Sequence, residues 1–346
     1  MPRKPASPRT PSSARPGLSH TAIAAIAVVL TAVIAGGVIV AVTLTGRSAG
    51  TAEAAAAPRN TTSGPVSPGP LHADTRMGAV RLTVGDVPAM RAFYSDGIGL
   101  DVLAETEGEI SLGQGGEELI RLVADATVAP RGNTDAGLYH SAILFPDAAA
   151  LAASLQSIAE RFPSSYQGSA DHTVSQAFYL GDPEGNGVEL YVDRPREEWE
   201  WIDGQVTMGS AALDPAAFIA EHLDAGAASP ATMGHVHLSV GDLESAEHFY
   251  VDVLGFDVTS RADGALFMSA GGYHHHLAAN TWNSAGAGAR GSSAGLRELA
   301  VILADRSELD AAAARIAEAG LSATVTDDGI TVLDPSNNVV RLRVAA

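Results

Sequence analysis

A long internal repeat constrains this fold more than any other feature of the sequence. The stretch MGAVRLTVGDVPAMRAFYSDGIGLDV, which starts at Met77, is closely matched by MGHVHLSVGDLESAEHFYVDVLGFDV, which starts at Met233. Each copy alternates apolar residues, passes through a Gly-Asp turn and continues with helical spacing, which predicts a strand, a helix and another strand. Repeated units of this kind bury their apolar faces against one another, so the architecture must be built from paired copies.

A second, weaker repeat doubles the number of units. The segment LYHSAILFPDAAALAASLQSIAERF from Leu138 resembles LRELAVILADRSELDAAAARIAEAG from Leu296. Both lead to alternating strands that follow Asp-Pro turns, at Asp182 and Asp334. The sequence therefore holds four modules, near residues 77–126, 137–193, 232–281 and 295–345. A helix with several short strands, repeated four times, predicts an α+β fold in which pairs of modules close curved sheets into half-barrels.

The residues before the repeats differ from them in composition. Residues 21–45 are apolar and carry no charge, which is long enough for a transmembrane helix across a core of ~30 Å. Because residues 1–20 are basic, we expect them to form a cytoplasmic tail, with the folded part of this single-pass membrane protein outside the cytoplasm. Secretion after signal cleavage is the alternative. Residues 46–76, rich in Ala, Pro, Gly, Ser and Thr, predict a disordered, flexible tether.

The repeats also define the expected domains. Residues 77–193 hold modules one and two and residues 232–346 hold modules three and four, with residues 194–231 as a connector. The chain has no cysteine, so any metal must be bound by His, Asp or Glu. Its net charge is -19, and only two of the 40 acidic residues precede residue 77. A strongly acidic folded region makes nucleic-acid binding unfavourable, since it repels phosphates.

Three candidate metal ligands occupy the ends of predicted strands. His140 lies in the first strand of module two, Glu189 in its last strand, and His235 in the first strand of module three. If modules two and three close one barrel, two imidazoles and one carboxylate meet on one face of a metal, an arrangement typical of non-haem Fe(II), with Mn(II) as the alternative. Modules one and four should then pair as a metal-free half, because their equivalent positions carry other residues, Ala79, Glu298 and Arg341.

The four modules resemble the βαβββ units of the vicinal oxygen chelate superfamily, which includes glyoxalases, bleomycin-resistance proteins and extradiol dioxygenases. The segment DHTVSQAFYLGDPEGNGVEL is similar to the extradiol dioxygenase signature, apart from Ala170 two places before its histidine. The chain looks most like the two-domain catechol 2,3-dioxygenase-like proteins. This resemblance implies that Glu189 binds the metal, that Tyr179 contacts a substrate oxygen, and that His172 lies just outside the metal ligands.

The run Tyr273-His274-His275-His276 is expected in the last strand of module three. Strand alternation would put His274 and His276 on one face and His275 on the other. The run resembles the paired-histidine strand of extradiol enzymes, and the family position favours His275 as the proton-transfer residue. Alternation also places His237 on the face of His235, so His237, His274 or His276 could replace or join the named residues; the family position after Gly234 favours His235.

The resemblance implies a ring-cleaving dioxygenase that acts on a small aromatic ortho-diol with O2. Two other functions remain open from the residues. One is a glyoxalase-like metal-dependent isomerase or lyase, in which the metal stabilises an enediolate and a fourth protein ligand is usual. The other is a non-catalytic small-molecule binder, like the bleomycin-resistance proteins. The sequence leaves the aromatic substrate and the oligomeric state open, a homo-oligomer included.

Overall fold

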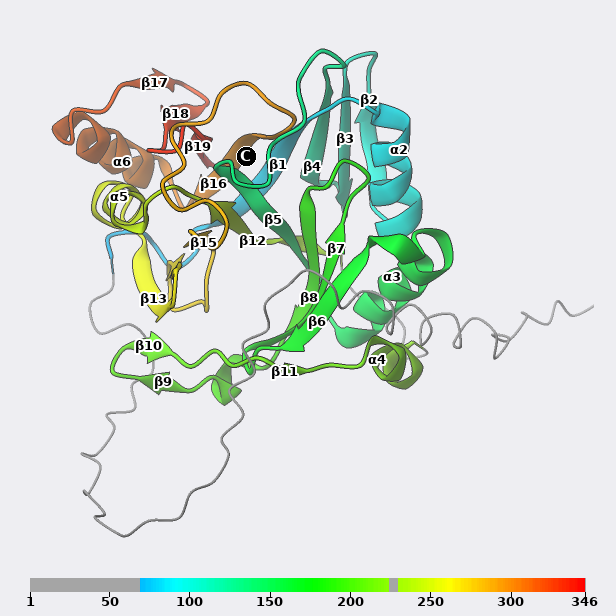
Figure 1. Ribbon diagram of the computed structural model, residues 1–346. Helices are drawn as coiled ribbons and strands as arrows, with labels where there is room; N and C mark the ends of the chain where they lie inside the picture. The colour runs from blue at the N-terminus through cyan, green and yellow to red at the C-terminus, as the bar shows by residue number, and fades with distance from the viewer. Residues whose placement is uncertain (1–68, 224–229, 346) are drawn as a thin grey trace, which may run out of the picture. The chain divides into compact units, whose positions relative to one another are not determined.

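The computed structural model describes residues 69–223 and 230–345 (Figure 1). The predicted tail, the membrane helix at 21–45 and most of the predicted tether lie outside the described residues. Among the helices of the described ranges, none combines the length and the apolar character needed to cross a membrane. The described part has the predicted α+β character, because each module consists of one strand, a helical segment and three further strands.

The elements follow the four predicted modules. The first contains β1 (Arg76–Val84), α2 (Val87–Ala92), a π-helical turn (Phe93–Ile98), β2 (Asp101–Glu105), β3 (Glu109–Gln114) and β4 (Glu117–Ala124). The second contains β5 (Gly137–Leu144), α3 (Ala148–Arg161), a short 3-10 turn (Pro163–Ser165), β6 (Tyr166–Asp171), β7 (Ser175–Gly181) and β8 (Gly187–Asp193). The third contains β12 (Thr232–Ser239), α5 (Leu243–Glu247), a π-helical turn (His248–Val253), β13 (Asp257–Ala262), β14 (Ala265–Ser269) and β15 (Leu277–Asn280). The fourth contains β16 (Gly295–Leu303), α6 (Arg306–Glu318), β17 (Ala323–Thr326), β18 (Gly329–Leu333) and β19 (Val339–Val344).

The connector between the second and third modules has little regular structure. It contains a 3-10 turn (Arg196–Glu198), the short strands β9 (Trp201–Ile202), β10 (Gln205–Val206) and β11 (Ala211–Ala212), and the helix α4 (Pro215–His222). β9 and β10 form a separate two-stranded sheet, whereas β11 pairs with β6 at the edge of a large one.

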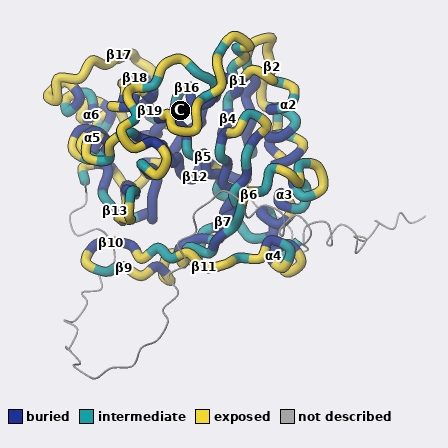
Figure 2. The backbone as a smooth tube through the Cα atoms, viewed as in Figure 1, coloured by how far each residue is buried: buried dark blue, intermediate teal, exposed yellow. Residues whose placement is uncertain are grey.

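Two mixed sheets hold the modules together. They join module one to module four and module two to module three, the pairing predicted from which modules keep the candidate metal ligands. An eight-stranded sheet of order β17-β18-β19-β16-β1-β4-β3-β2 joins modules one and four. A nine-stranded sheet of order β11-β6-β7-β8-β5-β12-β15-β14-β13 joins modules two and three. The seams are the antiparallel pairs β1/β16 and β5/β12. β1 and β12 are buried along nearly their whole length (Figure 2), so these seams are part of the core.

The aspartate that follows the first strand of each module begins the helix. Its side chain accepts a hydrogen bond from a backbone N–H in the first turn, which satisfies a donor that the helix itself cannot pair. The four residues are Asp86, Asp147, Asp242 and Asp305. The Gly-Asp turns recognised in modules one and three are therefore helix starts.

The repeated Phe-Tyr and Asp-Pro motifs contact each other. The Tyr94 hydroxyl donates to Asp182 over 3.1 Å, and the Tyr250 hydroxyl donates to Asp334 over 2.9 Å. All four side chains are buried. Burial raises the pKa of Asp182 to about 6, even though its carboxylate accepts hydrogen bonds that act in the opposite direction. These bonds link module one to module two, and module three to module four, across modules that belong to different sheets.

Candidate metal centre

Three adjacent strands of the nine-stranded sheet carry the predicted metal ligands. His140 lies on β5, Glu189 on β8 and His235 on β12, and β5 is hydrogen-bonded to both of the others. Ala142 lies opposite His235 on one side and opposite Glu189 on the other. Since directly opposed residues, and residues two apart in a strand, face the same side of a sheet, all three ligand side chains project from one face.

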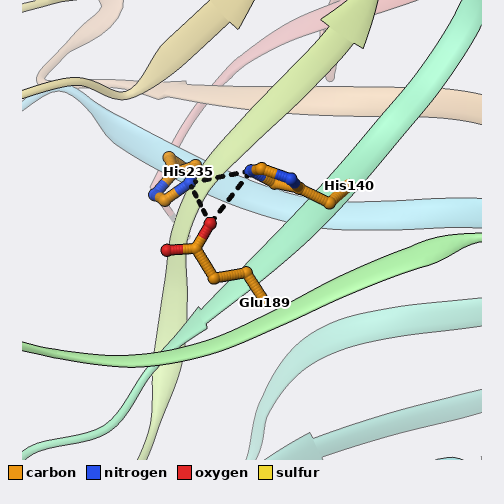
Figure 3. A group of neighbouring side chains, drawn as sticks. All are labelled: His140, Glu189 and His235. Atoms are coloured by element: carbon orange, nitrogen blue, oxygen red, sulfur yellow. Dashed lines mark hydrogen bonds and ion pairs between the residues drawn. The ribbon is translucent and has the colours of Figure 1, made fainter. Parts of the chain in front are cut away.

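The three side chains meet at one point (Figure 3). The Oε2 atom of Glu189 lies 3.0 Å from Nε2 of His140 and 3.3 Å from Nε2 of His235, and the two imidazole nitrogens are 3.2 Å apart. Donors that bind one ion at about 2.1 Å, at right angles, are about 3 Å apart. Within residues 69–223 and 230–345, this is the one group of three such donors whose atoms all lie within 4.8 Å of one another.

Burial and the neighbouring rings set the charges of this group. Burial by itself raises the pKa of Glu189, but His235 and His140 outweigh it and hold that pKa well below its usual range. Burial lowers the pKa of His235 to about 4. The group at neutral pH therefore contains a carboxylate and an unprotonated His235, the forms that bind a divalent metal. The donor set, without thiolate, fits a divalent ion of intermediate hardness.

A cavity of about 1040 Å³ opens onto this group. His140 and Glu189 reach it from the sheet, and aromatic rings form much of its wall, among them Tyr139, Tyr179, His237, Phe267, His275 and Trp282. Trp282 is 49% exposed, so one side of this wall faces solvent. The volume is at the upper end of the range for small-molecule sites.

His172 and Tyr179, both predicted from the signature, lie beside this cavity as a hydrogen-bonded pair. Nε2 of His172 is 2.7 Å from the Tyr179 hydroxyl, and Nδ1 is 2.8 Å from the carbonyl oxygen of Gly209. Tyr179 also lies directly opposite Glu189 in the β7/β8 ladder. Burial, helped by the charge of Glu189, raises the pKa of Tyr179 well above its ordinary value, so this phenol is neutral.

The prediction that the histidine run lies in a strand was wrong. β15 begins only at Leu277, and the run follows a turn made by Gly271 and Gly272, whose φ angles are 62° and 65°. Strand alternation therefore does not apply, and all three histidines are buried. His275 lines the cavity, with its ring centroid 4.0 Å from that of His235.

The other candidate histidines have partners of their own. His274 is hydrogen-bonded to Asp193, over 2.9 Å, and Nδ1 of His276 lies 3.0 Å from the Ser269 hydroxyl. His237 lines the cavity, but its Nε2 lies 2.9 Å from the side-chain amide of Asn280. The structure thus brings His275 and His237 to the cavity, while neither belongs to the three-donor group.

Asp193, Asn280 and Trp282 lie at or near this site and were not identified from the sequence. Asp193 had a usable signal, because it follows Glu189 by four residues in the same strand and strand alternation puts both on one face. Asn280 and Trp282 follow the misassigned histidine run and carried no such signal. Trp199 and Trp201 of the connector pack in a buried cluster with Tyr273.

In the eight-stranded sheet, two of the three positions equivalent to the metal ligands carry charged residues, Glu298 and Arg341, and the third carries Ala79. Glu298, at the position equivalent to His140, lies opposite Arg81 in the β1/β16 ladder, 3.8 Å from its guanidinium. Arg81 also pairs with Glu109 over 3.1 Å. Arg81 thus supplies positive charge next to the Glu298 carboxylate.

Comparisons with known proteins agree with this architecture. The family described as the Glyoxalase/Bleomycin resistance protein/Dioxygenase superfamily matches residues 76–190 and 232–342. Catechol-2,3-dioxygenase from Bacillus subtilis is 38% identical over 275 residues, which cover 77% of this chain and 95% of that protein. A solved putative dioxygenase from Bacillus subtilis matches 78% of this chain and 85% of its own, with a TM-score of 0.54 and 15% identity.

A solved glyoxalase I from Zea mays matches 78% of this chain and 92% of its own, with a TM-score of 0.47 and 17% identity. The family match alone spans well over half of the chain. Its first segment covers modules one and two, and its second covers modules three and four. The chain therefore belongs to the glyoxalase, bleomycin resistance protein and dioxygenase superfamily.

Proposed function

We propose that this protein is an extradiol ring-cleaving dioxygenase, which opens a catechol-type ortho-diphenol with O2 at a non-haem Fe(II) site, with Mn(II) as the alternative metal. The observation that carries the proposal is the convergence of His140, Glu189 and His235 on one buried point beside a large cavity. The similarity to a catechol-2,3-dioxygenase over 95% of that protein's length supports the reaction class.

The residues fit such a metal. His140, Glu189 and His235 would hold the ion from one side, and it would supply open positions at which the two oxygens of a diol and O2 bind next to each other. One carboxylate leaves a divalent ion with a net positive charge, which favours a substrate that binds as an anion. A glyoxalase-like reaction is less well supported, because the donor group within the described residues contains three members and not four.

Tyr179 orients the substrate. Nδ1 of a neutral His172 donates to the Gly209 carbonyl, so its Nε2 accepts the Tyr179 hydroxyl proton. The Tyr179 oxygen then presents lone pairs, which can accept a hydrogen bond from a substrate hydroxyl. His275 is suited to the first proton transfer, since burial holds its pKa well below the usual range and leaves it unprotonated at neutral pH. An unprotonated imidazole at the cavity wall can take a proton from the diol as a general base.

Aromatic side chains give the substrate ring a surface to pack on. The ring centroids of Tyr139 and Trp282 are 5.4 Å apart and nearly perpendicular, and His237 lies 4.9 Å from Tyr139. Edge-to-face and offset contacts with such rings favour a flat aromatic ligand over an aliphatic one of similar size. This wall supports a catechol rather than a small keto-aldehyde as substrate.

Oxygen uptake tests the proposal. The full chain, loaded anaerobically with Fe(II), should consume one O2 per catechol and form a yellow ring-opened product. Glu298→Ala, in the metal-free half, should behave as wild type, whereas His235→Ala should be inactive. Absence of oxygen uptake across a panel of substituted catechols, with metal bound, would overturn the dioxygenase assignment; turnover of a hemithioacetal instead would favour the isomerase.

We also propose, from the sequence of residues 21–45 and the basic residues before it, that the chain is anchored in the cell membrane with its catalytic part outside the cytoplasm. Release after cleavage remains the competing route.

A further inference from the structure

A row of hydrogen bonds leads from His275 at the cavity wall, through the buried His274, to Asp193. Nδ1 of His275 lies 2.7 Å from Nδ1 of His274, and Nε2 of His274 lies 2.9 Å from Oδ1 of Asp193. The His274 side chain is fully buried, whereas that of Asp193 keeps 24% of its surface exposed. Asp193 ends β8, the strand that also carries Glu189, so the row and the metal group share one strand.

The chemistry of the last member fixes the hydrogen positions of the others. A carboxylate can only accept, so Nε2 of His274 carries the hydrogen that points at Asp193. In a neutral imidazole the other nitrogen, Nδ1 of His274, then has a lone pair and accepts. The facing atom, Nδ1 of His275, must therefore be the donor. This leaves Nε2 of His275 as the unprotonated nitrogen, on a ring that lines the cavity.

We propose that Asp193 and His274 are positioning residues, which hold His275 in the tautomer whose basic Nε2 serves the cavity. The inference rests on the proposed function. In the step it assists, a substrate hydroxyl proton moves to Nε2 of His275, and the substrate oxygen keeps the electron pair. The imidazolium keeps its Nδ1–H bond to His274. Ring cleavage adds both atoms of O2 to the diol and loses no hydrogen, so the proton returns to the product.

Buried aromatic residues hold this row in place. The ring of Trp199 lies 5.1 Å from that of His274, and its indole N–H donates to the backbone of Arg194 over 3.0 Å. Tyr273 adds a second hydrogen bond to Asp193, over 3.3 Å, and its own hydroxyl is 2.7 Å from that of Tyr191.

A glycine gives Tyr191 the room it occupies. A Cβ at Gly234 would lie 1.8 Å from the Tyr191 hydroxyl, so only glycine permits this packing beside His235. Trp199 of the connector and Tyr191 of β8 thus help to enclose the hydrogen-bonded row.

The tautomer can be measured without metal or turnover. In the metal-free full chain labelled with ¹⁵N-histidine, long-range ¹H–¹⁵N spectra should show the hydrogen of His275 on Nδ1, its signals being assigned by their loss in His275→Gln. Asp193→Asn should shift it toward Nε2, because an amide can donate to His274. Wild-type His275 with its hydrogen on Nε2 would overturn the inference, whether or not the variants fold.

Kinetics of the Fe(II)-loaded chain separate positioning from structural support. Asp193→Asn should lower kcat about 100-fold, the scale of a misdirected general base, with KM changed less than about threefold and metal content unchanged. Asp193→Glu, which keeps a carboxylate, should recover part of this loss. His274→Asn should resemble Asp193→Asn, whereas the matched change His276→Asn, two residues away, should retain wild-type kcat.

The outcomes distinguish this inference from the proposed function. If wild type consumes O2 and Asp193→Asn is equally active, the row has no positioning role. If wild type consumes no O2 with any catechol, the proposed function is wrong, and the tautomer spectrum still decides whether Asp193 directs His275.

Discussion

The Tyr179 hydroxyl donates its hydrogen bond to His172, and the direction of this 2.7 Å bond is set by a third group. Nδ1 of His172 faces the carbonyl of Gly209, which can only accept, so Nδ1 carries the hydrogen and Nε2 must receive one. The hydroxyl hydrogen of Tyr179 therefore points at His172, and the lone pairs of the phenol oxygen are left free to accept a hydrogen bond from another group. A residue of the connector thus controls how Tyr179 meets a substrate.

Removing either member of this pair should impair turnover without releasing metal. We expect Tyr179→Phe and His172→Ala each to lower kcat/KM by about 2- to 10-fold, the effect of losing one hydrogen bond between neutral groups. Iron per chain should stay at the wild-type value, since neither side chain belongs to the three-donor group. Steady-state kinetics and elemental analysis check this, and loss of iron from either variant would contradict it.

The candidate ligands are present in modules two and three but replaced in modules one and four. Substitutions in the two pairs of modules should therefore have opposite outcomes. His140→Ala, Glu189→Ala and His235→Ala should each weaken metal affinity by more than about 100-fold, because one of three donors is lost. Glu298→Ala and Arg341→Ala should bind metal as wild type does. Competition with a chelator measures both sets. Metal that survives His140→Ala but is lost with Glu298→Ala would refute the assignment to modules two and three.

Acid should destabilise the metal-free chain through His276. Burial lowers its folded-state pKa to about 3, whereas the unfolded value is about 6.5. Between these two pKa values the unfolded chain binds a proton at His276 that the folded chain does not bind. The contribution of His276 to folding stability is therefore present above pH 6.5 and is lost as the pH falls toward 3. At pH 4.5 the loss is about 3 kcal/mol, to order of magnitude.

The matched variant is His276→Asn, whose side-chain oxygen can accept the hydrogen bond from the Ala270 N–H that now reaches Nδ1. Urea unfolding followed by circular dichroism from pH 7 to 4.5 should show a weaker pH dependence for this variant than for wild type. His248→Asn, at a side chain that is 69% exposed, should keep the wild-type dependence. Equal slopes for His276→Asn and wild type would contradict the assignment.

The proposed anchor is independent of the site. Deleting residues 1–47 should move the protein from the membrane fraction to the soluble fraction, because the apolar span belongs to no repeat. Metal binding should persist in the truncated chain. A soluble full-length chain, or a truncated chain that aggregates or loses its metal, would count against a separable membrane anchor.

The sequence by itself determined the fold class, the pairing of modules and the three candidate ligands. Repeats made this possible, because they align positions and show where one copy has kept a residue such as His235 while another has Ala79. Period-two alternation then places side chains on one face of a strand. These are local rules, and they hold for His140 and Glu189 because both lie in regular strands.

Only the tertiary structure decided the surroundings of the site. Gly271 and Gly272 turn the chain before β15, which cancels the alternation expected for the histidine run. The partner of His274 comes from 81 residues earlier, and the carbonyl that orients His172 comes from 37 residues later. Hydrogen-bond direction depends on such distant groups, whose position no local pattern encodes, because a ring nitrogen becomes donor or acceptor only according to what the folded chain places opposite it.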